Sequence, residues 1–349
     1  MDQIINLSIP HIGEQIFKNF STTKVLEFQQ VSKTWKVLAE NVIVKRWRGK
    51  LRKVLKTLKS SKVEVIKLLL THSKIEAAEL NQHFNGMTLF MWACKNGHIA
   101  IVKLLLERSD FDFNDKDSSE TKNTAFMWAC QNGHQDIVKT LLEEHSDSID
   151  YNAISGRCKA WTAFVIACQN GHREVVKLLL NYSNSKNIEV NGEEGLSWTL
   201  TVLSDVCRTR PHEAGGHVAV VKLLLDHANT NIDLNEKSDD GLTALMVACS
   251  KGNKDIVQLL LSYPNIALNA RCTGGFTALM FACSKRHKDV VKLLLDHSNE
   301  NELNARTSSG MTAFMSACIY GHEDVVQLLL DHSERIEMNA TDNSGLTGF

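Results

Sequence analysis

One phrase is repeated along most of the sequence. The stretch "MWACKNGHIAIVKLLL", residues 91–106, recurs in similar form from Met127, Val165, Met246, Met280 and Met315, and its second half recurs from Gly216. The residue after the central turn is His98, His134, His172, His217, Asn253, His287 and His322, with spacings of 36, 38, 45, 36, 34 and 35. Such a period predicts a repeat architecture, in which each copy buries its apolar face only by stacking on its neighbours.

Each copy has the pattern of two short helices joined by a tight turn. A Thr such as Thr243 precedes the first helix and is expected to cap its free backbone donors, and a Gly follows it, where the chain can take a left-handed conformation. The second helix, as at residues 255–261, places Asp at the positive end of the helix dipole and has a wide apolar face. An Asn returns after each second helix, at Asn114, Asn152, Asn191, Asn235, Asn269, Asn304 and Asn339. The Met and Trp residues of the first helices are expected in the core.

These elements resemble the ankyrin repeat. The match rests on segments such as "GLTALM" from Gly241, the Ala-Cys pair followed by Gly-His, and "VVKLLL", and it covers about residues 86–349. Three departures recur: Ala replaces the Pro after Thr, Met replaces the His before the Ala pair, and Cys replaces the second Ala. The resemblance implies an all-α ankyrin-repeat solenoid of helix pairs with β-turn or hairpin loops.

The predicted domain organisation has three parts after residue 48. Residues 83–345 hold about seven ankyrin repeats, of which the one at 196–238 is broken by an insertion at 207–215, either a functional or a degenerate loop. Residues 49–82 form an atypical amino-terminal capping repeat, and residues 346–349 begin a truncated further repeat. No polar cap follows residues 324–330, so we expect either that the sequence is a fragment or that a partner covers this end. Concentration-dependent dimerisation would indicate the second.

Residues 1–48 do not fit the repeat. Their apolar spacing, with Ile9-Pro10, "VSKTW" from Val31 and Trp47, is typical of short amphipathic helices. The segment resembles an F-box, the adaptor-binding module of cullin-type ubiquitin ligases. The resemblance implies adaptor contacts from Pro10, Ile16, Phe17, Phe20 and Leu26. The alternative is that these helices only extend the cap of the repeat array.

Composition excludes several classes of function. With 39 Lys and Arg against 40 Asp and Glu, the formal net charge is −1, so we expect no nucleic-acid partner. Every apolar run is too short to span a bilayer, and residues 1–17 lack the pattern of a secretory leader, so we expect no membrane partner and a cytoplasmic location, with the nucleus as the alternative. The nine cysteines are expected to stay reduced thiols.

The spacing of the recurring Cys and His pairs resembles that of metal ligands, but their sequence context favours a packing role. Cys94 and His98 are four residues apart, as metal ligands often are, but a Gly turn separates them and each copy lacks a second ligand pair. Asn253 replaces His in an otherwise intact copy, which a hydrogen-bonding role tolerates and a ligand role does not. We therefore expect Cys to fill space, His to bond backbone groups of neighbouring turns, and no metal or other cofactor.

Two further motifs suggest other functions. Residues 212–217, "HEAGGH", differ from the metalloprotease pattern in spacing, and Gly215-Gly216 argue against a firm helix there. Residues 45–62 hold nine Lys or Arg and no acid, which suits the solvated face of a capping helix, or alternatively polyanion binding or nuclear import. No catalytic motif stands out, so we expect the chain not to be an enzyme.

The leading hypothesis is a substrate-recognition subunit of a cullin-type (SCF) ubiquitin ligase, in which the F-box docks a Skp-type adaptor and the repeats bind an unidentified target protein. The alternative is a non-ligase ankyrin scaffold. Ankyrin arrays, by resemblance, bind through turn tips and the ends of first helices, and variable residues on a fixed scaffold are candidates for specificity. The target-binding candidates are Lys95, Asn96, Gln131, Asn132, Gln169, Asn170, Ser250, Lys251, Ser284, Lys285, Ile319 and Tyr320.

Overall fold

A computed structural model describes most of the repeat region. The described residues are 66–67, 70, 80–108, 112–144, 148–156, 161–186, 188, 203–207, 214–227 and 233–348. The predicted F-box, residues 1–48, and most of the predicted capping repeat, residues 49–82, therefore lie outside them. The chain divides into two compact units, unit 1 at residues 1–158 and unit 2 at residues 159–349.

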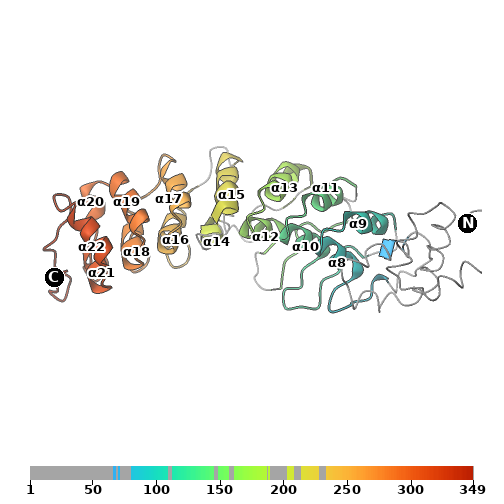
Figure 1. The fold of residues 1–349 in the computed structure, drawn as a ribbon, viewed down its shortest axis with the longest axis horizontal. Helices are drawn as coiled ribbons and strands as arrows, with labels where there is room; N and C mark the ends of the chain where they lie inside the picture. Colours follow the sequence, from blue (N-terminus) through green and yellow to red (C-terminus); the bar gives the residue numbers. More distant parts are fainter. Residues whose placement is uncertain are drawn as a thin grey trace, which may run out of the picture. The chain divides into compact units, whose positions relative to one another are not determined.

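Unit 1 contains two complete helix pairs among its described residues. The helices are α8 (Leu89–Lys95), α9 (Ile99–Leu106), α10 (Ala125–Gln131) and α11 (Gln135–Glu144). The first helices α8 and α10 pack together, as do the second helices α9 and α11, which gives two layers in this unit (Figure 1). The short antiparallel bridge between Phe84 and Met87 forms the hairpin loop that leads into α8.

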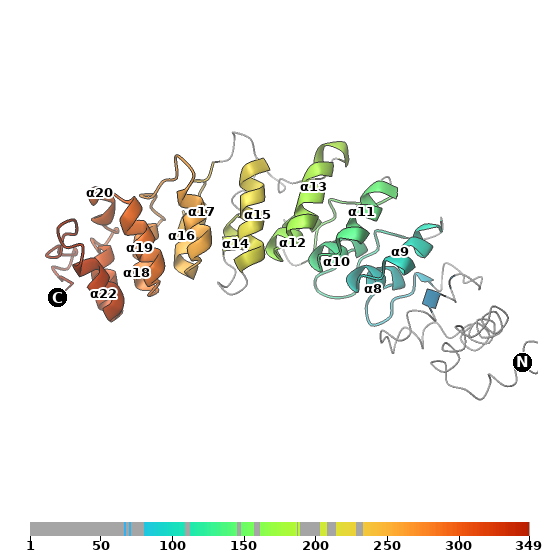
Figure 2. The same ribbon diagram turned by 45° about the horizontal axis from the view of Figure 1, so that its top comes forward.

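Unit 2 continues the same arrangement through five helix pairs and one extra short helix. The helices are α12 (Ala163–Gln169), α13 (Arg173–Lys186), α14 (Ser204–Cys207), α15 (Ala214–His227), α16 (Ala244–Lys251), α17 (Lys254–Leu261), α18 (Ala278–Ser284), α19 (Lys288–His297), α20 (Glu300–Leu303), α21 (Ala313–Ile319) and α22 (Glu323–Leu330). First helices pack in the order α12, α14, α16, α18, α21, and second helices in the order α13, α15, α17, α19, α22 (Figure 2). The predicted all-α solenoid of helix pairs is confirmed.

Local chemistry fixes where the first helices begin and end. The predicted Thr caps are present, since Thr88, Thr124, Thr243, Thr277 and Thr312 each accept a hydrogen bond from the backbone N–H three residues on. The turn that ends a first helix needs a left-handed residue, and Gly252 takes it at φ 74° with no Cβ to strain the backbone. Arg286 occupies the same position at φ 60°, so one repeat tolerates a side chain there.

The core lies between the two helix layers. The largest fully buried side chains include Phe90, Phe126, Phe164 and Phe314, all at the second position of a first helix. Burial of each such ring contributes about 2–3 kcal/mol to folding. The Met residues one position later are also buried, as expected, and the Ile, Val and Leu residues of the second helices close the layer. Among the described helices, none is both long enough and apolar enough to cross a membrane.

Loop contacts between repeats complete the stack. In unit 2, Asn235 donates through Nδ2 to the carbonyl oxygen of Asn265 at 2.7 Å and accepts from the N–H of Ala267 at 2.7 Å. Asn304 makes the equivalent pair of bonds with Arg335 and Glu337, and in unit 1 Asn114 does so with Ser148 and Asp150. Much of the recurrence of Asn after the second helix therefore has a structural cause.

The repeat predicted to be broken is more complete than the sequence indicated. Its first helix is present as α14, which packs between α12 and α16, and Cys207 is fully buried in the slot that Cys249 fills in the next repeat. The prediction that Gly215-Gly216 rule out a firm helix is wrong, since both lie in the first turn of α15. The two Gly residues cost conformational entropy in a helix, and the burial of Val220, Val221 and Leu224 farther along α15 offsets that cost by packing. Cys207 and residues 214–215 of the predicted insertion are thus helical.

Candidate functional site

The Cys and His pairs are structural in the described repeats. Cys94, Cys168 and Cys283 are fully buried, and burial raises the pKa of each thiol well above its usual range, which disfavours the thiolate that a metal requires. In the described part of the chain no group of three or more potential ligands could hold a metal ion. The packing interpretation of Cys is therefore confirmed at the buried positions, whereas Cys318 of the last pair is partly exposed.

Four of the His residues contact the preceding repeat rather than the Cys of their own repeat. Nε2 donates to a backbone carbonyl oxygen in His134 with Lys95 at 2.9 Å, His217 with Gln169 at 2.7 Å, His287 with Ser250 at 3.0 Å, and His322 with Ser284 at 3.0 Å. Asn253 performs the same role through Nδ2, which donates to the carbonyl oxygen of Cys207 at 2.8 Å. The predicted hydrogen-bonding role of this position is thus confirmed, including its tolerance of Asn.

These bonds are made at the ends of the first helices, where the target-binding candidates also lie. The first member of each candidate pair is half-buried in Lys95, Gln131, Gln169, Ser250 and Ser284. Four of these five supply the carbonyl oxygen that a His of the next repeat contacts. The carbonyl groups of these four residues therefore hold neighbouring repeats together, and we take their side chains as the candidate contacts for a partner.

The second member of each pair divides the repeats into two kinds. The Nδ2 atoms of Asn96, Asn132 and Asn170 each donate at 2.8 Å to a carbonyl oxygen of their own first helix, so these amides cap the helix end. Lys251, Lys285 and Tyr320 occupy the same position in later repeats and are exposed without such a bond. The sequence pattern did not distinguish these two kinds.

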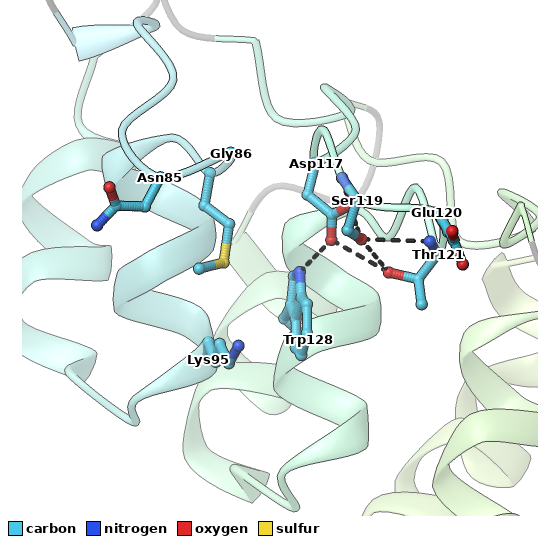
Figure 3. Close-up of a pocket in the computed structure, with 9 residues that line it drawn as sticks. Asn85, Gly86, Lys95, Asp117, Ser119, Glu120, Thr121 and Trp128 are labelled. Carbon is cyan, nitrogen blue, oxygen red and sulfur yellow. Dashed lines mark hydrogen bonds between the residues drawn. The ribbon is translucent and has the colours of Figure 1, made fainter.

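A pocket of about 440 Å³ opens beside the first helices of unit 1 (Figure 3). Trp128 lines it, and its indole Nε1 donates to Oδ2 of Asp117 at 2.9 Å while the Lys95 ammonium lies 3.9 Å from the ring centroid. The attraction between this cation and the ring contributes about 0.5–1 kcal/mol at an exposed site. Both the indole and the lysine are therefore held by contacts within unit 1.

The prediction that the Trp residues belong to the core is wrong. Trp92 and Trp128 are half-buried, whereas the Met residues next to them are buried. The same helix position is buried in Val247 and Ser316 and half-buried in Phe281, so the larger rings at this position are the ones that remain partly exposed. Sequence reasoning did not identify this helix position as part of a pocket. The variation of the residue there could have indicated it, since the position holds Trp92, Trp128, Val247, Phe281 and Ser316.

A smaller pocket of about 280 Å³ has the same register in unit 2. Its walls are Leu242, Met246, Val247, Ser250, Lys251 and Phe281. Phe281 corresponds to Trp128 of the first pocket, Ser250 to Lys95 and Leu242 to Met87. The repeat therefore places an aromatic floor against a helix end in both units, with different side chains at the rim.

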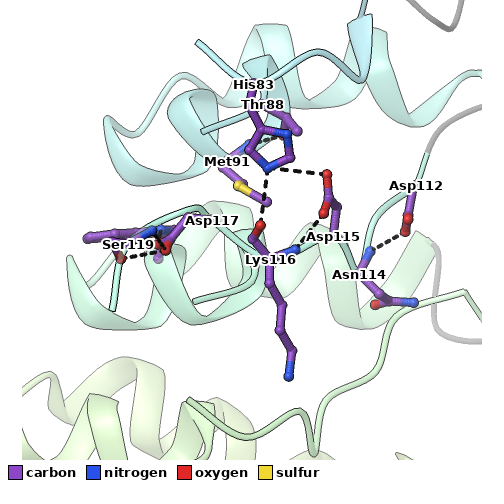
Figure 4. Close-up of polar contacts among 10 residues, drawn as sticks. His83, Thr88, Met91, Asp112, Asn114, Asp115, Lys116, Asp117 and Ser119 are labelled. Atoms are coloured by element: carbon purple, nitrogen blue, oxygen red, sulfur yellow. Dashed lines mark hydrogen bonds and ion pairs between the residues drawn. The ribbon is translucent and has the colours of Figure 1, made fainter. Parts of the chain in front are cut away.

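The acidic loop at residues 112–120 is organised by its own backbone (Figure 4). Asp112, Asp115 and Asp117 accept hydrogen bonds from backbone N–H groups of Asn114, Lys116 and Ser119, at 2.9, 2.8 and 3.0 Å. Nε2 of His83 lies 3.1 Å from the carbonyl oxygen of Lys116 and 3.5 Å from Oδ2 of Asp115. These carboxylates shape the loop that borders the larger pocket.

The family follows from a comparison of the sequence with protein-family models. A model of ankyrin repeats in three copies matches residues 56–155, 112–193, 150–232, 200–272 and 265–342. The chain belongs to the ankyrin-repeat family. Ankyrin repeats are a protein–protein interaction module, and ankyrin-repeat proteins are typically interaction scaffolds rather than enzymes. No curated protein matches the chain in a further comparison.

The match places both pockets and all twelve target-binding candidates inside ankyrin repeats. It begins at residue 56, so the segment that resembles an F-box lies before it. Within the ankyrin repeats, the exposed helix-end side chains and the two pockets remain the candidate binding surface, because much of the backbone around them is bonded to neighbouring repeats.

Proposed function

We propose that this ankyrin-repeat protein is the substrate-recognition subunit of a cullin-type ubiquitin ligase. The observation that supports target binding is that, at the helix ends, backbone carbonyls bind the next repeat while side chains remain exposed. Carbonyl groups such as that of Ser250 bind the next repeat, whereas the side chain of Lys251 in the same turn is exposed. A fixed backbone with variable exposed side chains supports a role in recognition.

The ligase half of the proposal rests on the sequence of residues 9–47. Pro10, Ile16, Phe17, Phe20 and Leu26 match the apolar positions by which an F-box contacts a Skp-type adaptor. The chain would supply no catalytic group. Its contribution is proximity, because tethering a target to the ligase raises the effective concentration of target lysines at the catalytic subunit. We expect it to act where that machinery operates, in the cytoplasm or nucleus.

The test is co-purification of the intact chain with a Skp-type adaptor. We expect the chain to bind, and Phe17→Ala with Leu26→Ala to weaken binding about tenfold or more, since large apolar side chains dominate such interfaces. A matched control is Ile319→Ser with Tyr320→Ser, which removes two apolar side chains from the ankyrin repeats and leaves adaptor binding unchanged. Failure of the intact chain to bind, or binding that survives the double alanine substitution, would overturn the ligase proposal.

The second candidate is an ankyrin scaffold that binds a protein without directing ubiquitin. The family match over residues 56–342 supports it, because ankyrin repeats are a protein–protein interaction module that needs no ligase to bind a partner. Target binding without adaptor binding in the same preparation would support this candidate.

A further inference from the structure

We propose that the helix ends of α16, α18 and α21 bind an extended acidic segment of the target protein, whose apolar side chain enters the pocket floored by Phe281. This inference deepens the target-binding half of the proposed function and rests on it. It selects a strip within unit 2, here called the Lys–Tyr strip and defined as Lys251, Lys285, Ile319 and Tyr320.

The strip differs from the ends of α8, α10 and α12 because its side chains make no capping bond. Asn170, the corresponding residue of α12 in the same unit, directs its amide to the carbonyl oxygen of Ile166. Lys251 and Lys285 instead form no ion pair with any residue that the structure describes, and both are exposed. Two uncompensated ammonium groups at the same repeat position favour a negatively charged partner.

The acidic side chains of the adjoining second helices form no ion pair with Lys251 or Lys285 among the described residues. Asp324 lies 3.0 Å from Nε of Arg286, an ion pair between adjacent repeats. Asp255 and Asp289 lie in the first turns of α17 and α19, where the helix dipole favours a negative charge. The lysines of the strip therefore keep their charge available to a partner.

The strip ends on an exposed apolar pair. Ile319 is 63% exposed and Tyr320 is 60% exposed, and with Leu346 they are the large hydrophobic side chains exposed in the described part of the chain. The ring of Tyr320 is stacked on His322, with centroids 6.0 Å apart and an interplanar angle of 18°. A held aromatic face loses little entropy on binding and is a common anchor in protein interfaces.

The pocket lies at the other end of the strip. Lys251 and Ser250 line it together with the apolar side chains of Met246, Val247 and Phe281, and its volume is about 280 Å³. This space suits one aliphatic or aromatic side chain. The order along the packed first helices is therefore the pocket with Lys251, then Lys285, then Ile319-Tyr320.

The packing sets the spacing of the segment. Neighbouring helices pack about 8–10 Å apart, and an extended chain advances about 3.3 Å per residue. One repeat therefore corresponds to about three residues of target. We expect two acidic residues about three positions apart, an apolar side chain near the first, and a second apolar side chain beyond the other.

A peptide fits the strip better than a nucleic acid does. Nucleic-acid binding depends on several phosphate contacts from clustered Lys and Arg, whereas the strip offers two lysines between apolar elements. The formal net charge of the chain is −1, which gives no general attraction to a polyanion.

The experiment uses the full chain and a fluorescent synthetic peptide with two Glu about three residues apart, flanked by Leu and Tyr, in an anisotropy titration. Comparison probes replace both Glu with Lys, replace Leu and Tyr with Ser, or substitute a single-stranded oligonucleotide. We expect the acidic peptide to bind most tightly and to weaken with added salt. Equal binding of the Lys peptide, or tighter binding of the oligonucleotide, would overturn the proposal.

Variants then locate the site. Lys251→Glu with Lys285→Glu is expected to weaken binding about tenfold, because reversal replaces two attractions with repulsions. Ile319→Ser with Tyr320→Ser is expected to weaken it by a similar factor. The matched control, Lys222→Glu with Lys292→Glu, changes two exposed lysines on second helices by the same total charge and should leave binding unchanged.

The two proposals fail separately. If the adaptor co-purifies but the acidic peptide binds equally well to both strip variants and to the control, the strip is wrong and the ligase proposal stands. If the strip variants alone lose the peptide while the adaptor does not bind, the strip stands and the ligase proposal is wrong. Circular dichroism of every variant checks that the repeats remain folded.

Discussion

Nε2 of His287 lies 3.0 Å from the carbonyl oxygen of Ser250, which belongs to the preceding repeat. The contact joins α18 and its turn to the end of α16, so a side chain of one copy satisfies a backbone group of another. The same relationship recurs at His134, His217 and His322. This bond therefore couples successive repeats within each of the two compact units.

Replacement of His287 by Ala should destabilise unit 2 by about 1–2 kcal/mol, because it removes a hydrogen bond and leaves the carbonyl of Ser250 without this partner. Urea unfolding followed by circular dichroism measures the loss. His297 supplies the control, since its ring is exposed and, among the described residues, its hydrogen bond is to the carbonyl of Leu293 in its own helix. His297→Ala should therefore change stability by less than about 0.5 kcal/mol. Equal effects of the two substitutions would contradict the coupling role.

Asn235 and Asn269 occupy the same repeat position but differ in their contacts. Asn235 bonds the loop of the next repeat twice, at 2.7 Å each, whereas the side chain of Asn269 makes no such contact with the described residues. Asn235→Ala should therefore cost about 1–2 kcal/mol of unfolding free energy and Asn269→Ala less than about 0.5. Chemical denaturation of the two variants side by side makes the comparison; a larger loss for Asn269→Ala would be inconsistent with these contacts.

Thiol reactivity should follow burial. Cys272 and Cys318 are partly exposed, whereas Cys94, Cys168 and Cys283 are fully buried, and burial raises the pKa of these three thiols. We expect an alkylating reagent to label Cys272 and Cys318 in the folded protein and the buried cysteines only after unfolding. Mass spectrometry of digested samples locates the label, and rapid labelling of Cys283 under native conditions would contradict the structure.

Stability should fall as the pH is lowered through the titration range of His98. Burial of its ring, together with the positive charges of His134 and Lys67, lowers the pKa of His98 in the folded protein. Below about pH 6.5 the unfolded chain therefore binds more protons at this residue, so protonation favours unfolding. Denaturation at a series of pH values should show a smaller pH dependence for His98→Asn, a replacement that the array already uses at Asn253. An unchanged pH dependence would show that His98 does not contribute.

The helix pairs and their caps were predictable because they depend on local chemistry. Thr243 caps α16 through its own hydroxyl, and Gly252 ends it because a left-handed residue is required there. The role of His was predictable for a different reason: replacement by Asn253 in an intact repeat excluded a metal ligand and retained a hydrogen bond.

The helix α14 was not predictable from the repeated phrase. Residues 204–207 carry little of that phrase, and a helix of this length is not stable alone. Its packing between α12 and α16 stabilises it, with Val206 and Cys207 fully buried. The neighbouring repeats, more than its own sequence, determine this element.

The sequence by itself determined the repeat, its helix pairs, its turns and the positions at which side chains vary. Only the tertiary structure decided which of those side chains are free to bind. Asn96 folds back on the carbonyl of Trp92 and Lys95 lies over Trp128, whereas Lys251 and Tyr320 extend into solvent. The reason is that periodicity fixes where a residue stands on a helix, while its availability depends on the groups that packing brings within reach of it.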